Sequence, residues 1–90
     1  MPRGQHRRTR QPGESNAQRK RRNIFYRINQ VVEVGEQLTS RMMMDRAIIK
    51  FGAGHYDLPR NADTLGHMLT HRDDYVKVRV KGKNEWRRTQ

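Results

Sequence analysis

The last sixteen residues constrain the fold of this chain most, because apolar and cationic side chains alternate along them. Three valines and three cations follow one another in turn: Val76, Lys77, Val78, Arg79, Val80 and Lys81. Successive side chains of a β-strand point to opposite faces, so such a strand has one apolar and one cationic face. Gly82 and Asn84 are typical of a chain reversal, and Trp86 opens a second short run. A small β-hairpin is therefore predicted, with the valines and Trp86 completing an apolar core.

The positive charge of the chain is concentrated at its two ends. The formal net charge is +11 over 90 residues. Residues 1–22 carry eight Lys or Arg and one acid, residues 75–90 carry six and one, and residues 23–74 carry six and seven. Charge that served only solubility would mix both signs throughout the chain. The distribution instead indicates a polyanionic partner, either a nucleic acid or an anionic membrane face.

Length and composition predict a single soluble domain. Hydrophobic and charged residues each make up 32% of the chain, which leaves a modest core. No apolar run approaches the roughly 18 residues that span a bilayer, and no signal peptide is visible. Cysteine is absent, which excludes disulfides and thiolate metal sites. We expect a cytoplasmic protein with no membrane partner.

The N-terminal segment, residues 1–16, is predicted to be a disordered basic arm. It has no aliphatic side chain beyond Met1, and two prolines and two glycines interrupt regular structure. Ser15 or Asn16 can cap a helix that follows. The folded domain is expected to comprise residues 17–90.

A first helix is predicted over residues 17–34, ended by Gly35. Apolar side chains recur along it at helical spacing and form the predicted core stripe: Ile24, Phe25, Ile28, Val31 and Val32.

A second helix is predicted over residues 41–51, with Ser40 as its N-cap. Its core stripe consists of Met44, Ala47, Ile48 and Phe51. Met42 and Ile49 lie off that stripe. Either this helix is sandwiched between its neighbours, which we favour, or Met42 and Ile49 offer a contact for a homodimer.

A third, short helix is predicted from Ala62 to His71 or Arg72, with Asn61 as its N-cap. Leu58, in the loop before it, is expected to enter the core. The inward side of this helix is predicted to consist of Ala62, Leu65, Met68 and Leu69.

The order of helix, helix, short helix and basic hairpin resembles the winged helix-turn-helix fold over residues 20–88. The segment 58–78 is similar to a recognition helix that runs into a wing strand, with a central Leu65-Gly66-x-x-Leu69. In the return strand, Trp86 is followed by basic residues, as in many such wings. The resemblance implies an α+β fold, a three-helix winged helix-turn-helix with a C-terminal β-hairpin wing. It also implies a DNA-binding protein, and we expect a small transcription regulator.

The resemblance also implies that the third helix contacts base edges in the major groove of double-stranded DNA. The contacts are expected from its entry and its outward side: Arg60, Asn61, Thr64, His67 and His71. Asp63 departs from this pattern because a carboxylate repels phosphates. Two roles fit it: contact with a cytosine amino group, or stabilisation of the positive N-terminus of the helix, which we favour.

Phosphate contacts are expected from both basic ends. The wing would supply Lys77, Arg79, Lys81, Lys83, Arg87 and Arg88. The arm and the start of the first helix would supply Arg7, Arg8, Arg10, Arg19, Lys20, Arg21 and Arg22. Affinity that depends on phosphates falls steeply with salt.

Two other functions fit the same charges. The arginine-rich segments resemble those of RNA-binding or ribosome-associated proteins, although the few aromatic residues weigh against a binder of single strands. The third hypothesis is a nucleic-acid-packaging or protein-docking module, because a fold does not fix a function.

A homodimer that forms through Met42 and Ile49, or through the first helix, is compatible with all three hypotheses.

No catalytic residue, metal ligand or cofactor is predicted. His67 and His71 are spaced i, i+4, but the chain has neither cysteine nor the glutamate of an HExxH motif. They are interpreted as exposed polar residues of the third helix. There is no glycine-rich phosphate loop and no serine with a histidine and an acid in a triad-like context. We therefore expect a protein that is not an enzyme.

Overall fold

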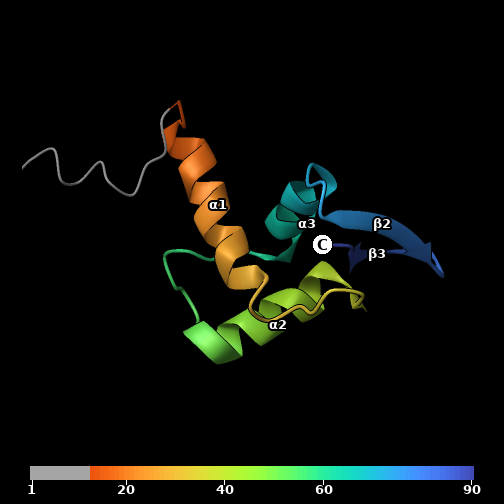
Figure 1. The fold of residues 1–90 in the computed structure, drawn as a ribbon. Coiled ribbons are helices and arrows are strands. Elements are labelled where there is room, and N and C mark those ends of the chain that lie inside the picture. Colours follow the sequence, from red (N-terminus) through yellow and green to blue (C-terminus); the bar gives the residue numbers. More distant parts are fainter. Residues whose placement is uncertain (1–12) are drawn as a thin grey trace, which may run out of the picture.

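The computed structural model describes residues 13–90, which form three helices followed by a β-hairpin (Figure 1). The helices are α1 (Asn16–Ile28), α2 (Ser40–Phe51) and α3 (Ala62–Thr70). The strands are β1 (Gln37–Leu38), β2 (Tyr75–Val80) and β3 (Lys83–Arg88). The predicted α+β architecture of three helices and a C-terminal hairpin is confirmed. Most of the predicted disordered arm, residues 1–12, lies outside the described residues.

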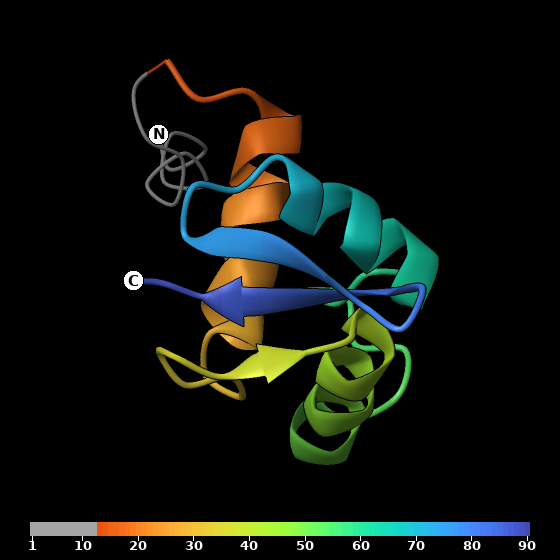
Figure 2. The same ribbon diagram turned by 90° about the vertical axis from the view of Figure 1, so that its right-hand side faces the viewer.

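The three strands form one antiparallel sheet in the order β1-β3-β2 (Figure 2). β1 is a two-residue strand in which Gln37 lies opposite Arg87 and Leu38 opposite Trp86. The sequence predicted only a connection there. A strand between the first two helices that pairs with the return strand of the hairpin is consistent with the winged helix-turn-helix topology.

Helix α1 begins at a capping box. The hydroxyl of Ser15 accepts a hydrogen bond from the backbone N–H of Gln18, and the Gln18 side chain accepts one from the N–H of Ser15. The helix ends at Ile28, with Asn29 as C-cap, so the predicted extension to residue 34 is wrong. The chain turns after Asn29, yet Val32 still packs into the core from this turn. The apolar side chains therefore keep their helical spacing in the sequence beyond the point where the helix itself ends.

Helix α2 is not sandwiched on both sides. Thr39, one residue before the predicted cap, accepts a hydrogen bond from the N–H of Met42. Met43 is fully buried, whereas Met42 is 47% and Ile49 85% exposed. The favoured interpretation, in which Met42 and Ile49 are sandwiched between neighbouring elements, is therefore wrong, because their side of α2 faces solvent.

Helix α3 follows the prediction closely. The side chain of Asn61 accepts a hydrogen bond from the N–H of Thr64 at 2.8 Å, which confirms it as the N-cap. Leu65 and Leu69 are buried in the core, and Leu58 enters it from the preceding loop as expected. The hairpin packs on α3 through Trp86, which is 5% exposed.

The valines of β2 do not complete the core, which corrects the sequence prediction. The register places Lys77 opposite Trp86 and Val78 opposite Glu85, so Lys77 and Trp86 share one face of the sheet. Tyr75, which is also buried, lies on that face and packs near Phe25 at a ring-centroid distance of 6.1 Å. Because Tyr75 enters the core, period-two alternation sends Val76, 44% exposed, and the other valines to the opposite face.

Candidate nucleic-acid interface

The predicted base-reading residues lie together on the exposed side of α3. Leu65, Gly66 and Leu69 turn inward to the core. The residues left facing outward are all exposed: Arg60, Asn61, Thr64, His67 and His71. Asn61 also caps the first turn of the helix, so its side-chain amide oxygen already accepts a hydrogen bond from the backbone N–H of Thr64. Asp63 is in that first turn, the position at which a carboxylate stabilises a helix N-terminus.

A hollow of about 570 Å³ lies between α3 and the hairpin, beside the contact of Gly66 with Trp86. Asp63, His67 and Thr70 line it from α3, while Lys77, Asn84 and Trp86 line it from the hairpin. Lys77 reaches this position because it shares a face with Trp86, as Arg79 does with its partner Asn84. The side of α3 that carries Asp63, His67 and Thr70 and the inner face of the hairpin therefore form one concave surface.

Thr70 and Asn84 belong to this concave surface, although the sequence did not single them out. Thr70 donates its hydroxyl to the backbone carbonyl of Gly66 at 2.9 Å. Asn84 was interpreted as a residue of the hairpin turn, whereas it lies within β3, opposite Arg79. Only the strand register reveals that it faces α3.

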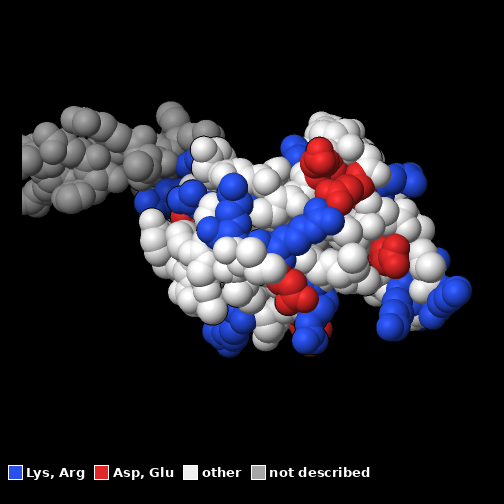
Figure 3. Space-filling model, turned by 90° about the horizontal axis from the view of Figure 1, so that it is seen from below, with Lys and Arg blue, Asp and Glu red and all other residues white. Residues whose placement is uncertain are grey.

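The hairpin cations divide between its two faces and its tip. Lys77 and Arg79 are on the inner face, and Lys83 and Arg87 share the outer face with the valines. Lys81 stands in the turn at φ 48°, followed by Gly82 at φ 79°, in the left-handed region that tight hairpin turns require. All five cations are exposed, and Figure 3 shows basic side chains at the hairpin end as well as elsewhere on the face that it draws.

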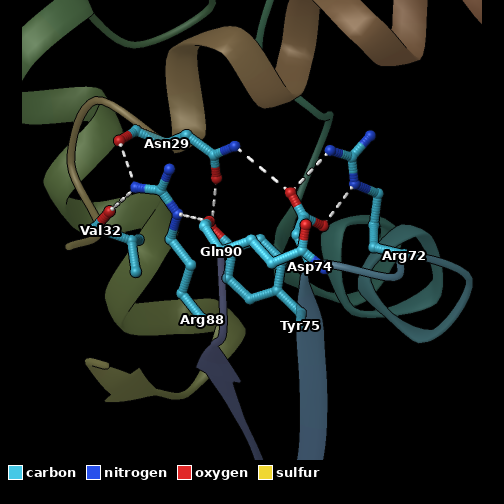
Figure 4. A network of polar contacts seen from close by, with 7 residues as sticks. All are labelled: Asn29, Val32, Arg72, Asp74, Tyr75, Arg88 and Gln90. Atoms are coloured by element: carbon cyan, nitrogen blue, oxygen red, sulfur yellow. Dashed lines mark hydrogen bonds and ion pairs between the residues drawn. The ribbon is translucent and has the colours of Figure 1, made fainter. Parts of the chain in front are cut away.

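Arg88 has a different environment from the other hairpin cations. Its Nη1 donates to the backbone carbonyls of Asn29 at 3.1 Å and Val32 at 2.6 Å, and its Nε donates to that of Gln90 at 2.7 Å (Figure 4). The carbonyls of Asn29 and Val32 belong to the turn after α1. The predicted phosphate-binding residue thus ties this turn to β3.

A polar network joins the same turn to the start of β2. Tyr75 donates its hydroxyl to Asn29 Oδ1 at 2.5 Å, and Arg72 forms paired hydrogen bonds of 2.9 and 2.8 Å to Asp74 (Figure 4). Burial by itself would raise the pKa of Asp74, but Arg72 and Asn29 together outweigh it and lower the pKa. Burial raises the pKa of Tyr75 to about 12. These groups are structural and hold the hairpin on α1.

The phosphate contacts predicted for the N-terminal arm and the first helix are only partly described by the structure. Arg7, Arg8 and Arg10 lie outside the described residues. The others are on α1: Arg19, Lys20, Arg21 and Arg22. Arg22 forms an ion pair with Glu14 at 2.9 Å. Lys20 lines a second hollow, between α1 and α3, together with Arg60 and Thr64. The exposed side of α3 is therefore flanked by a basic residue of α1 on one side and by those of the hairpin on the other.

Within residues 13–90, no three histidine, aspartate or glutamate side chains are grouped so as to hold a metal ion. None of the helices in this part of the chain is both long and apolar enough to cross a bilayer. No protein-family model matches the chain, and no curated protein or solved structure matches it significantly. The resemblance to winged helices therefore rests on element order and strand pairing.

Proposed function

We propose that the protein binds double-stranded DNA as a small sequence-specific transcription regulator. In this proposal α3 enters the major groove, and the hairpin and the N-terminal basic segment contact phosphates. The observation that carries it is the strand register, which puts Lys77 on the hollow that His67 of α3 also lines, with Arg79 on the same face of the hairpin. One duplex can then meet the helix and the cations together.

The exposed side of α3 has the chemistry for direct readout. Arg60 can form paired hydrogen bonds with guanine, and His67 offers ring nitrogens to base edges. Thr64 presents a hydroxyl and a methyl group, and the methyl suits contact with thymine. Because α3 carries Thr64 and His67, the spacing of these two side chains is fixed before binding, and Arg60 directly precedes the N-cap of the helix.

The hairpin has the chemistry for contacts that do not depend on sequence. Its cations are exposed, and the only acid of the hairpin, Glu85, accepts a hydrogen bond from Gln37 at 2.8 Å. Each phosphate that a cation neutralises releases a counterion, so these residues should govern the salt dependence of binding. Backbone contacts of this kind position a reading helix without specifying bases.

The test begins with a selection of binding sites from random duplexes at physiological salt. The selected duplex, a scrambled duplex and a structured RNA hairpin are then titrated against the wild type and two variants. His67→Ala should weaken the selected duplex by about tenfold and leave the scrambled duplex unchanged, because a base contact is worth about 1–3 kcal/mol. Lys81→Ala should weaken both duplexes similarly and lower the salt slope by about one unit.

Lys50→Ala is the matched control for lost charge, because Lys50 is an exposed cation at the end of α2. It should change neither duplex titration. Equal losses on both duplexes for His67→Ala would reject base readout by α3 and favour a non-specific packaging protein. Tighter binding of the RNA hairpin than of any selected duplex would favour the RNA-binding alternative.

A further inference from the structure

A series of ring side chains, joined through one arginine, lies on a surface that the duplex proposal does not use. We call it the aromatic patch, formed by Tyr26, Arg27, Phe51, His55 and Tyr56. It joins α1, the end of α2 and the α2–α3 loop, and this loop runs on the α1 side of the molecule, away from the hairpin (Figure 1). No sequence pattern indicated this patch, because its members are up to thirty residues apart.

The side chains of the patch form a continuous series of contacts. The guanidinium carbon of Arg27 lies 5.5 Å from the ring centroid of Tyr26 and 5.3 Å from that of Phe51. The Phe51 ring lies 5.8 Å from His55, and His55 stacks on Tyr56 at 4.7 Å with an interplanar angle of 15°. Cation–π and stacking contacts of this kind fix ring orientation.

The two tyrosines at the ends of the series are exposed. Tyr26 is 66% and Tyr56 74% exposed, although aromatic rings are costly to leave in water. Since one face of Tyr56 is stacked on His55, its other face is left for a further planar group. Two exposed aromatic rings in a preformed arrangement are typical of a binding surface rather than of a core.

The loop that carries Tyr56 is held in place. Leu58 and Pro59 are buried, and Asp57 forms an ion pair with Arg27 at 3.5 Å. The backbone N–H of Asp57 donates to His55 Nδ1 at 3.0 Å, and Lys20 Nζ donates to the Tyr56 carbonyl at 3.3 Å. Because the fold already orders this surface, a ligand that binds to it would cause little further loss of conformational entropy.

A hollow of about 460 Å³ adjoins the patch. His55, Tyr56 and Pro59 line it from the loop, and Met44 and Ile48 line it from α2. Its size is within the range of pockets for small organic groups, roughly 300–1,000 Å³. Lys20 and Lys50 add exposed positive charge beside the patch, the second 5.9 Å from the Phe51 ring.

We infer that the aromatic patch binds unpaired nucleobases of a single strand, of DNA or RNA. Bases stack on Tyr26 and Tyr56, and the strand passes Lys20 and Lys50 with its phosphates toward them. Every nucleobase has a π-face, so binding is tolerant of sequence. The flanking cations favour a polyanion over a neutral peptide. The stacking rings of this site are separate from the duplex surface of α3, although Lys20 borders both. The tyrosine variants therefore test this site without changing the residues proposed for the duplex.

The test measures fluorescence anisotropy of labelled eight-nucleotide strands: oligothymidylate DNA, oligouridylate RNA and an abasic strand of the same charge. The wild type should bind strands with bases at least tenfold more tightly than the abasic strand. Tyr26→Ala and Tyr56→Ala should each remove about tenfold of that affinity and leave abasic binding unchanged. Tyr56→Phe should keep it, because the stacking ring is retained. The DNA and RNA arms show which strand is preferred.

Ile49→Ala is the matched control, since it removes an exposed apolar side chain of α2 that is not part of the patch. It should leave all three titrations unchanged. Equal binding of base-containing and abasic strands by the wild type would overturn the inference, as would full affinity in Tyr56→Ala. Far-UV circular dichroism of each variant excludes unfolding, and if Tyr26→Ala unfolds, the comparison of Tyr56→Ala with Tyr56→Phe decides. Duplex titration of the tyrosine variants should be normal, which distinguishes this site from that of α3.

Discussion

Gly66 of α3 lies directly against Trp86 of β3. A Cβ atom added at Gly66 would come within 3.3 Å of Cη2 of the Trp86 ring. A glycine inside a helix costs about 1 kcal/mol relative to alanine. Here its missing side chain is replaced by the indole ring, which fills the space between helix and sheet. This contact sets how closely the hairpin approaches α3, and with it the shape of the concave surface between them.

We predict that Gly66→Leu destabilises the fold. Leucine favours a helix, so its own propensity would stabilise α3, but its side chain must displace the Trp86 ring. Overpacking of this kind costs about 1–3 kcal/mol. Urea unfolding followed by far-UV circular dichroism measures the change. His67→Leu, at the adjacent exposed position, is the control and should remain within about 0.5 kcal/mol of the wild type.

Trp86→Ala is expected to cost about 3–5 kcal/mol of the free energy of unfolding. The ring is buried between Gly66 and the sheet, opposite Leu38 and Lys77, and its loss leaves a cavity under α3. Thermal unfolding and urea titration both measure the effect. A variant that kept full stability and lost only nucleic-acid binding would show that Trp86 is a ligand contact and not a core residue.

Arg87 and Arg88, adjacent in sequence, should respond in opposite ways to replacement by methionine. Arg88→Met removes the donors to the turn carbonyls of Asn29 and Val32 and should cost about 1–3 kcal/mol of stability. Arg87→Met removes an exposed cation and should change stability by less than about 0.5 kcal/mol.

The same two variants also distinguish a role in stability from a role in nucleic-acid binding. Arg87→Met should lower the slope of log affinity against log salt by about one unit, while Arg88→Met at a temperature where it is folded should not. Urea unfolding and duplex titrations at several salt concentrations provide both readouts. Equal stability of the two variants would contradict the structural role of Arg88.

The pair also marks what the sequence can and cannot predict. Composition treats the two arginines alike, and both were expected to bind phosphates. Only the three-dimensional turn after α1 brings acceptor carbonyls to Arg88. Strand β1 was missed for a related reason, since two residues carry no periodicity and their partner strand lies almost fifty positions further on.

Local signals were more reliable. Asn61 was identified as an N-cap and Leu58 as a core residue because each depends on nearby sequence. The valine alternation predicted a strand correctly but assigned its faces wrongly. Which face is buried was decided by Tyr75, a single residue at the junction with α3. The aromatic patch depends entirely on contacts between α1, α2 and the loop, so no sequence pattern could reveal it.

The ion pair between Arg72 and Asp74 should make stability fall in acid. The pKa of Asp74 is lowered in the folded protein, so as the pH falls the unfolded chain takes up the proton first. The contribution is fully present above the ordinary pKa of 3.8 and is lost as the pH falls from there through the folded value. Asp74→Asn should therefore be less stable than the wild type near neutrality, and the difference should shrink below pH 3.8.

Urea unfolding at a series of pH values between neutrality and acid tests this convergence. Glu36, whose pKa is lowered by its hydrogen bond from Arg46, acts in the same direction, so Asp74→Asn should retain part of the acid sensitivity. Asp73→Asn is the control, because Asp73 is the exposed neighbour and should follow the wild-type curve. If the Asp74→Asn curve stays parallel to the wild type throughout, the pair with Arg72 contributes no pH-dependent stability, and Asp74 acts only through geometry.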